Sequence, residues 1–114
     1  MNNKSTRHYS DAQEKRIAKT LGGKVQCNSG GTRFGGGDVH TSLFLIEAKT
    51  SEKPKSSFSV KEEWLKKAKL QAFEQGKMCS ALAISFDTEK DYYIVDADTF
   101  RIMHNLLEKE LMEE

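Results

Sequence analysis

The sequence predicts an α/β fold in which helices flank a mixed sheet of five strands, in the order α-β-β-β-α-β-β-α. Three observations predict this fold. Segments with apolar residues at helical spacing alternate with short apolar runs typical of strands. Capping-box pairs and glycines mark the ends of the expected helices. A length of 114 residues leaves room for one core, so we expect a single domain over residues 1–114, with residues 1–9 as a flexible arm.

The first helix is expected over residues 10–21. Ser10 and Gln13 form a capping box at its start, and two glycines follow its last turn. On a helical wheel, Glu14 falls in the middle of the apolar stripe. A carboxylate in that place is either paired with a buried cation or part of a functional site.

Three strands are expected next, at residues 24–27, 38–40 and 43–49, with a loop of five glycines at residues 28–37. A tight turn at Thr41 and Ser42 joins the second strand to the third. This turn places Asp38 opposite Leu45 and diagonal to Glu47.

The second half of the chain predicts a long helix, two strands and a last helix. Ser59 and Glu62 form a second capping box, and Gly76 ends the helix that it opens. Lys61 shares the face of this helix that packs on the core. The strands follow at residues 80–86 and 92–95, and Asp98 or a neighbouring residue caps the last helix.

The composition argues against several classes of protein. The longest apolar runs have four residues, whereas a membrane span needs about 20. We expect no secretory leader, because the first residues lack an apolar region. The two cysteines lie far apart and fit neither a disulfide framework nor a zinc site, which favours the reducing cytoplasm. No Gly-Lys-Ser/Thr follows the glycine-rich loop, so we expect no nucleotide cofactor.

Charge is divided unequally along the chain. Residues 1–77 contain 15 Lys and Arg against 8 Asp and Glu, whereas residues 78–114 contain 3 against 9. The first part therefore has a net charge of +7 and the second part a net charge of −6. This asymmetry predicts a basic face, and a basic face favours a polyanion such as nucleic acid as the partner.

The third strand is the strongest candidate for chemistry. Glu47 and Lys49 point to the same side of this strand, and Asp38 begins the strand that folds back on it. Two converging carboxylates repel each other, a divalent cation relieves the repulsion, and oxygen ligands favour Mg²⁺ or Mn²⁺. Lys49 cannot bind a cation but can stabilise charge on a phosphate. The alternative is an ion pair with a structural role only.

These residues resemble a known signature. Gly37-Asp38-Val39, followed after seven residues by Glu47-Ala48-Lys49, looks like the motif of the PD-(D/E)XK nuclease superfamily, with glycine in place of the usual proline. With Glu14 in a preceding helix and the glycine-rich loop, the chain from about Arg7 to Val95 resembles small Holliday junction resolvases of the archaeal and phage-encoded types.

The resemblance implies a restriction-endonuclease-like fold and a set of site residues. Lys49 is implied to be catalytic, Glu14 to be an accessory acid, and Ser29 to lie near the scissile phosphate. The implied ligands of Mg²⁺ or Mn²⁺ are Asp38, Glu47 and the carbonyl oxygen of Ala48. The expected DNA-binding residues are Arg7, Arg33, Lys53, Lys55 and Lys61.

The sequence therefore predicts a metal-dependent, structure-selective DNA endonuclease that resolves Holliday junctions or other branched DNA. We expect it in the cytoplasm, which is the host cytoplasm if a phage encodes the chain. Two alternatives stay open: a nicking or single-strand-specific nuclease of the same fold, and a nucleic-acid-binding module without catalysis. A homodimer is expected, with Leu70 and Phe73, the last helix or an edge strand as its possible interface.

Overall fold

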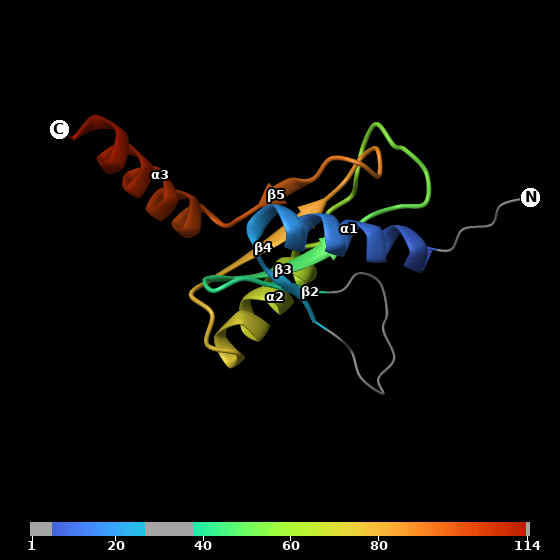
Figure 1. The fold of residues 1–114 in the computed structure, drawn as a ribbon, viewed down its shortest axis with the longest axis horizontal. Helices are drawn as coiled ribbons and strands as arrows, with labels where there is room; N and C mark the ends of the chain where they lie inside the picture. Colours follow the sequence, from blue (N-terminus) through green and yellow to red (C-terminus); the bar gives the residue numbers. More distant parts are fainter. Residues whose placement is uncertain (1–5, 27–37, 114) are drawn as a thin grey trace, which may run out of the picture.

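The structure of the protein, a computed structural model, describes residues 6–26 and 38–113 (Figure 1). It confirms the predicted fold class, because five strands form one mixed sheet and the helices follow in the predicted order. The elements are α1 (Thr6–Leu21), β1 (Lys24–Val25), β2 (Asp38–His40), β3 (Phe44–Lys49), α2 (Glu62–Glu74), β4 (Cys79–Ile84), β5 (Tyr92–Ile94) and α3 (Ala97–Met112). The glycine-rich loop expected at residues 28–37 lies outside the described residues.

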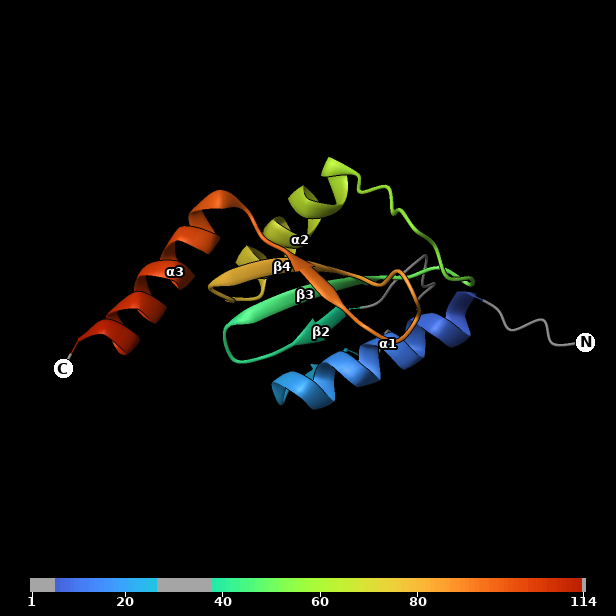
Figure 2. The ribbon, with the colours of Figure 1, turned by 90° about the horizontal axis from the view of Figure 1, so that it is seen from above.

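The strands lie side by side in the order β1-β2-β3-β4-β5. β3 and β4 are parallel, and the chain between them contains α2, since parallel neighbours need a crossover connection. The other three pairs of neighbouring strands are antiparallel. Figure 2 shows the sheet between α1 on one side and α2 on the other.

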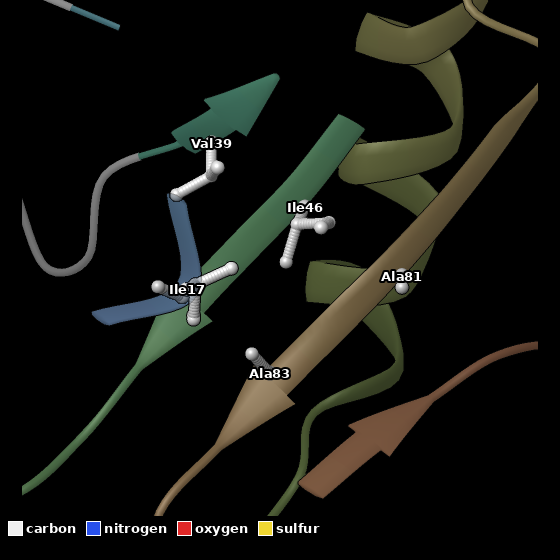
Figure 3. Packing of buried hydrophobic residues seen from close by; sticks show 6 residues of the cluster. Ile17, Val39, Ile46, Ala81 and Ala83 are labelled. Carbon is white, nitrogen blue, oxygen red and sulfur yellow. The ribbon is translucent and has the colours of Figure 1, made fainter. Parts of the chain in front are cut away.

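The alternation of side chains along β3 creates two separate packing layers. Ile46 faces α1 and belongs to the same buried cluster as Ile17 (Figure 3). Leu45 faces α2 and packs with Ala68 of that helix. Because alternate residues of a strand share a face, Glu47 points to the α2 side of the sheet, as Leu45 does.

The hairpin between β2 and β3 turns one residue later than predicted. The backbone N–H of Thr41 donates to the carbonyl oxygen of Phe44 at 2.9 Å, and the Thr41 hydroxyl accepts from the N–H of Phe44 at 2.9 Å. These bonds place Ser42 and Leu43 in the turn, whereas the sequence predicted Thr41 and Ser42. Asp38 therefore lies opposite Glu47, and the predicted pairing of Asp38 with Leu45 is wrong.

The helix α1 begins four residues earlier than predicted, at Thr6. Residues 6–9, which the sequence assigned to the flexible arm, belong to this helix in the structure. Ser10 does not cap the helix: it lies inside α1, where its hydroxyl donates to Oε2 of Glu14 at 3.2 Å. The bond to Glu14 satisfies the buried Ser10 hydroxyl within the helix. The spacing of Ser10 and Gln13 nevertheless looks like a helix start in the sequence.

The other two helices differ in how they begin, because only α3 has a side-chain cap. α2 begins at Glu62, and its N-cap residue is the extended Lys61, whose side chain makes no capping bond. The capping box predicted at Ser59 is therefore wrong. In α3, the N-cap is Asp96, whose carboxylate accepts from the N–H of Thr99 at 2.8 Å. This residue is the neighbour that the sequence allowed as an alternative to Asp98.

Polar contacts bind α1 to the end of β3 and to Asp91, the residue before β5. Arg16 donates from Nε to Oδ2 of Asp91 at 2.6 Å and from Nη2 to Oδ1 at 2.8 Å. This hydrogen bonding raises the pKa of the Arg16 guanidinium, so the group stays charged. The fully buried Gln13 donates from Nε2 to Oδ1 of Asp91 at 3.1 Å and to the carbonyl oxygen of Lys49 at 3.0 Å. Gln13 therefore fixes the end of β3 instead of forming a capping box.

The helix α3 extends away from the sheet (Figure 1), and none of its described residues is buried. None of the helices in the described part of the chain is both long and apolar enough to cross a lipid bilayer. The large apolar side chains that α3 leaves exposed are Phe100, Ile102, Met103, Leu106, Leu107, Leu111 and Met112.

Candidate active site

The structure brings three of the predicted site residues together on the α2 side of the sheet. Asp38 and Glu47 are direct partners across the antiparallel pair β2 and β3. The Nζ atom of Lys49 lies 3.3 Å from Oε2 of Glu47. Asp38 and Lys49 are half-buried and Glu47 is buried, so the group lies at the border of the core with access to solvent.

Burial and the neighbouring Asp38 perturb the carboxyl group of Glu47. Burial, a hydrogen bond with Asp38 and the negative charge of Asp38 raise the pKa of Glu47 to about 7, and the opposing effect of Lys49 is smaller. Near neutral pH, Glu47 therefore holds a proton for part of the time, because burial and the neighbouring carboxylate both disfavour its ionised form. A divalent cation could replace that proton and interact with both groups.

The ammonium group of Lys49 has a second neighbour that the sequence did not identify. Its Nζ atom lies 4.7 Å from the centroid of the Trp64 ring, and the Nζ atom of Lys61 lies 5.8 Å from the same centroid. Trp64 is half-buried. The available signal was the position of this single tryptophan in the first turn of the helix that follows the motif strand.

Glu14 is buried in α1, and α1 packs on the opposite side of the sheet from α2 (Figure 2). Its carboxylate accepts from the hydroxyl of Ser10. Within residues 6–26 and 38–113, no group of three or more His, Cys, Asp or Glu side chains is placed to hold a metal ion. The accessory role of Glu14 and the ligand role of the Ala48 carbonyl stay predictions.

The predicted DNA-binding residues are only partly described. Ser29 and Arg33 lie outside the described residues, and so does the side chain of Arg7, although Arg7 belongs to α1. Lys53, Lys55 and Lys61 are exposed in the segment between β3 and α2. Two of the three, Lys55 and Lys61, line a polar cleft of about 630 Å³ that also includes Trp64.

In comparisons with protein-family models, with curated proteins and with solved structures, nothing matches this chain. The functional interpretation consequently depends on the residues and the geometry described above. That geometry is a carboxyl pair with an ammonium group beside it, next to a cleft that carries two lysines.

The raised pKa of Glu47 predicts a pH-dependent stability of the metal-free protein. The folded-state pKa of about 7 exceeds the ordinary value of 4.5, so the carboxyl group destabilises the fold as pH rises from 4.5 to 7. We expect Glu47→Gln to change stability little at pH 4 and to stabilise the fold at pH 8 by on the order of 3 kcal/mol. Urea unfolding in EDTA between pH 4 and pH 8 measures this difference.

Glu74→Gln, at an exposed position on α2, is the matched control and should show no such pH dependence. A difference between Glu47→Gln and the wild type that stays constant over the whole pH range contradicts the raised pKa.

Proposed function

We propose that the protein is a metal-dependent, structure-selective DNA endonuclease that hydrolyses phosphodiester bonds in Holliday junctions or other branched DNA. The observation that supports this most is the direct pairing of Asp38 with Glu47, together with the 3.3 Å contact between Glu47 and Lys49. All three residues belong to the part of the chain with a net positive charge. Two carboxyl groups and one ammonium group in such surroundings suit a reaction on a phosphate ester.

The carboxyl pair fits a divalent cation. Burial and the neighbouring Asp38 raise the pKa of Glu47, so ionised Glu47 is unfavourable in the metal-free protein. A hard cation in the place of the proton would offset the negative charge of both carboxylates and remove this cost. Mg²⁺ or Mn²⁺ bound by Asp38 and Glu47, with the Ala48 carbonyl as a further ligand, would supply Lewis-acid activation and charge neutralisation at the phosphate.

Lys49 contributes the positive charge that the chain itself provides. An ammonium group has three donors, and the contact with Glu47 occupies one of them. The Trp64 ring, whose centroid lies 4.7 Å from the Lys49 Nζ atom, limits the positions that the flexible side chain can take. We infer that Lys49 donates a hydrogen bond to the attacking water or to a non-bridging phosphate oxygen, whose negative charge grows in the transition state.

The substrate structure is a separate part of the proposal. A nicking or single-strand-specific nuclease would use the same three residues, so only the pattern of cleavage distinguishes it from a junction-resolving enzyme. Paired symmetric incisions in a four-way junction support resolution. Cuts in a single strand, or preference for unpaired DNA, support the alternative.

Symmetric cleavage requires two sites, and we propose a homodimer that forms through α3. An apolar groove of about 370 Å³, lined in part by Leu21, Leu43 and Met103, lies between the β2–β3 turn and α3. The groove is lined mostly by apolar residues, and α3 leaves large apolar side chains such as Leu106 and Leu107 exposed. This match favours the α3 helix of a second copy as the partner of the groove.

The nuclease proposal predicts that Lys49→Ala and Asp38→Ala lose activity. Cleavage of a labelled four-way junction in Mg²⁺ should fall by about 10²–10³-fold in Lys49→Ala, because a group that stabilises transition-state charge is removed. Lys66→Ala is the control, because this lysine is exposed and pairs only weakly with Glu62 on the surface of α2. If both site variants fold and cleave as the wild type does, the nuclease proposal is wrong.

The dimer proposal predicts that Leu107→Asp on α3 produces a monomer. Sedimentation equilibrium should give twice the chain mass of 12.9 kDa for the wild type and the single mass for this variant. Leu70→Asp on α2 is the matched control, since Leu70 and Leu107 are exposed to 58% and 59%. A monomeric wild type, or a Leu107→Asp variant that stays dimeric, contradicts the role of α3.

A further inference from the structure

We propose that the cleft between the end of β3 and the start of α2 binds the DNA backbone next to the scissile phosphate, through phosphate contacts that do not depend on base sequence. This inference rests on the proposed nuclease function, and it assigns the position and the chemistry of a substrate-binding site. The cleft has a volume of about 630 Å³ and is lined by Lys55, Phe58, Lys61 and Trp64, together with hydroxyl-bearing residues.

The cleft begins where the candidate active site ends. Thr50, which follows Lys49 in the chain, lines the cleft, and so does Trp64. The Trp64 ring lies near the ammonium groups of both Lys49 and Lys61, so one aromatic side chain connects the site to the cleft. A strand whose scissile phosphate lies at Lys49 would therefore continue along Trp64 and into the cleft.

The side chains of the cleft match a phosphodiester. Two lysines supply positive charge, and none of the described residues that line the cleft is acidic. The hydroxyl groups supply further donors for phosphate oxygens. The nearby Glu62 lines a different groove, on the side of α2 that carries Lys66. The hydroxyl-bearing residues of the cleft are Thr50, Ser56, Ser57 and Ser59.

The outer wall of the cleft is attached to the sheet. The backbone N–H of Lys55 donates to the carbonyl oxygen of Phe86 at 2.7 Å, just after β4. The ring of Phe58 packs edge-on against the ring of Phe86, with 6.5 Å between centroids, and Phe86 packs in the same way against Tyr92 of β5. These contacts hold the wall in place before DNA binds, which reduces the entropy lost on binding.

Each cleft lysine also lies over an aromatic ring. The Nζ atom of Lys55 is 5.6 Å from the centroid of Phe58, and that of Lys61 is 5.8 Å from the centroid of Trp64. The rings attract the ammonium groups and restrict the side chains that carry them. They also leave less ring surface open for stacking of bases, which is why we assign the cleft to the backbone and not to the bases.

The test measures binding of a fluorescent four-way junction in EDTA, where a metal-dependent enzyme does not cleave, over a series of salt concentrations. We expect Lys55→Ala and Lys61→Ala each to weaken binding by about 3–10-fold, equally for junctions of different sequence. Each should also reduce the slope of log K against log salt by about 0.9, since one phosphate contact is lost. Lys66→Ala, on the surface of α2, should bind as the wild type does.

Two controls accompany this test. Charge-conserving variants distinguish the loss of a lysine's charge from misfolding, and a phosphate competitor distinguishes a DNA site from a site for free phosphate. Lys55→Arg and Lys61→Arg keep the charge and should restore most of the binding, and unfolding midpoints establish that each variant folds. Inorganic phosphate at the concentration of junction phosphate should displace little DNA; strong displacement would indicate a site for free phosphate and would overturn the proposal. Unchanged binding in both alanine variants, or a loss that differs between sequences, would overturn it as well.

The outcome for the cleft is separate from the outcome for the nuclease. If the wild type binds junctions through Lys55 and Lys61 but never cleaves them in Mg²⁺, the catalytic proposal fails and the phosphate-binding cleft stands. If the wild type cleaves and both alanine variants bind normally, the cleft proposal fails alone. A wild type that binds no DNA overturns the cleft directly.

Discussion

The register of the β2–β3 hairpin is the constraint on which the candidate site depends. It places Asp38 directly opposite Glu47, so two carboxyl groups meet on the same face of the sheet. The hydroxyl of Thr41 contributes to this register by accepting a hydrogen bond from the N–H of Phe44. A slip of one residue in the pairing would turn one of the two acids to the other face of the sheet. Burial and the enforced proximity of Asp38 raise the pKa of Glu47.

Elements on both sides of the sheet converge on the end of β3. Gln13 of α1 holds the carbonyl oxygen of Lys49, which fixes the backbone of that residue. Trp64 of α2 lies beside the Lys49 ammonium group, which limits the side chain. The residue proposed to act on the phosphate is thus held by one helix through its backbone and by the other through its side chain, and the cleft continues from there.

The sequence predicted the element order and the mixed sheet, because apolar periodicity and glycines at helix ends are local signals. It also placed Asp38, Glu47 and Lys49 close together, but with the wrong pairing, since the turn depends on a side-chain bond of Thr41 that spacing does not reveal. The roles of Gln13 and Trp64 were missed because both depend on contacts with residues distant in the chain. Glu14, in contrast, is buried, as its position in the apolar stripe indicated.

The most direct measurement of the central claim is the unfolding midpoint of the protein as Mn²⁺ is added to the metal-free form. A cation held by the carboxyl pair binds the folded state, so the midpoint should rise as the Mn²⁺ concentration rises. A Mn²⁺ concentration of 100 times the dissociation constant stabilises the fold by about 2.7 kcal/mol. We expect this rise in the wild type and in Asp98→Asn, an exposed position on α3, and its loss in Asp38→Asn. No rise in the wild type, or an equal rise in Asp38→Asn, would contradict a metal site at Asp38 and Glu47.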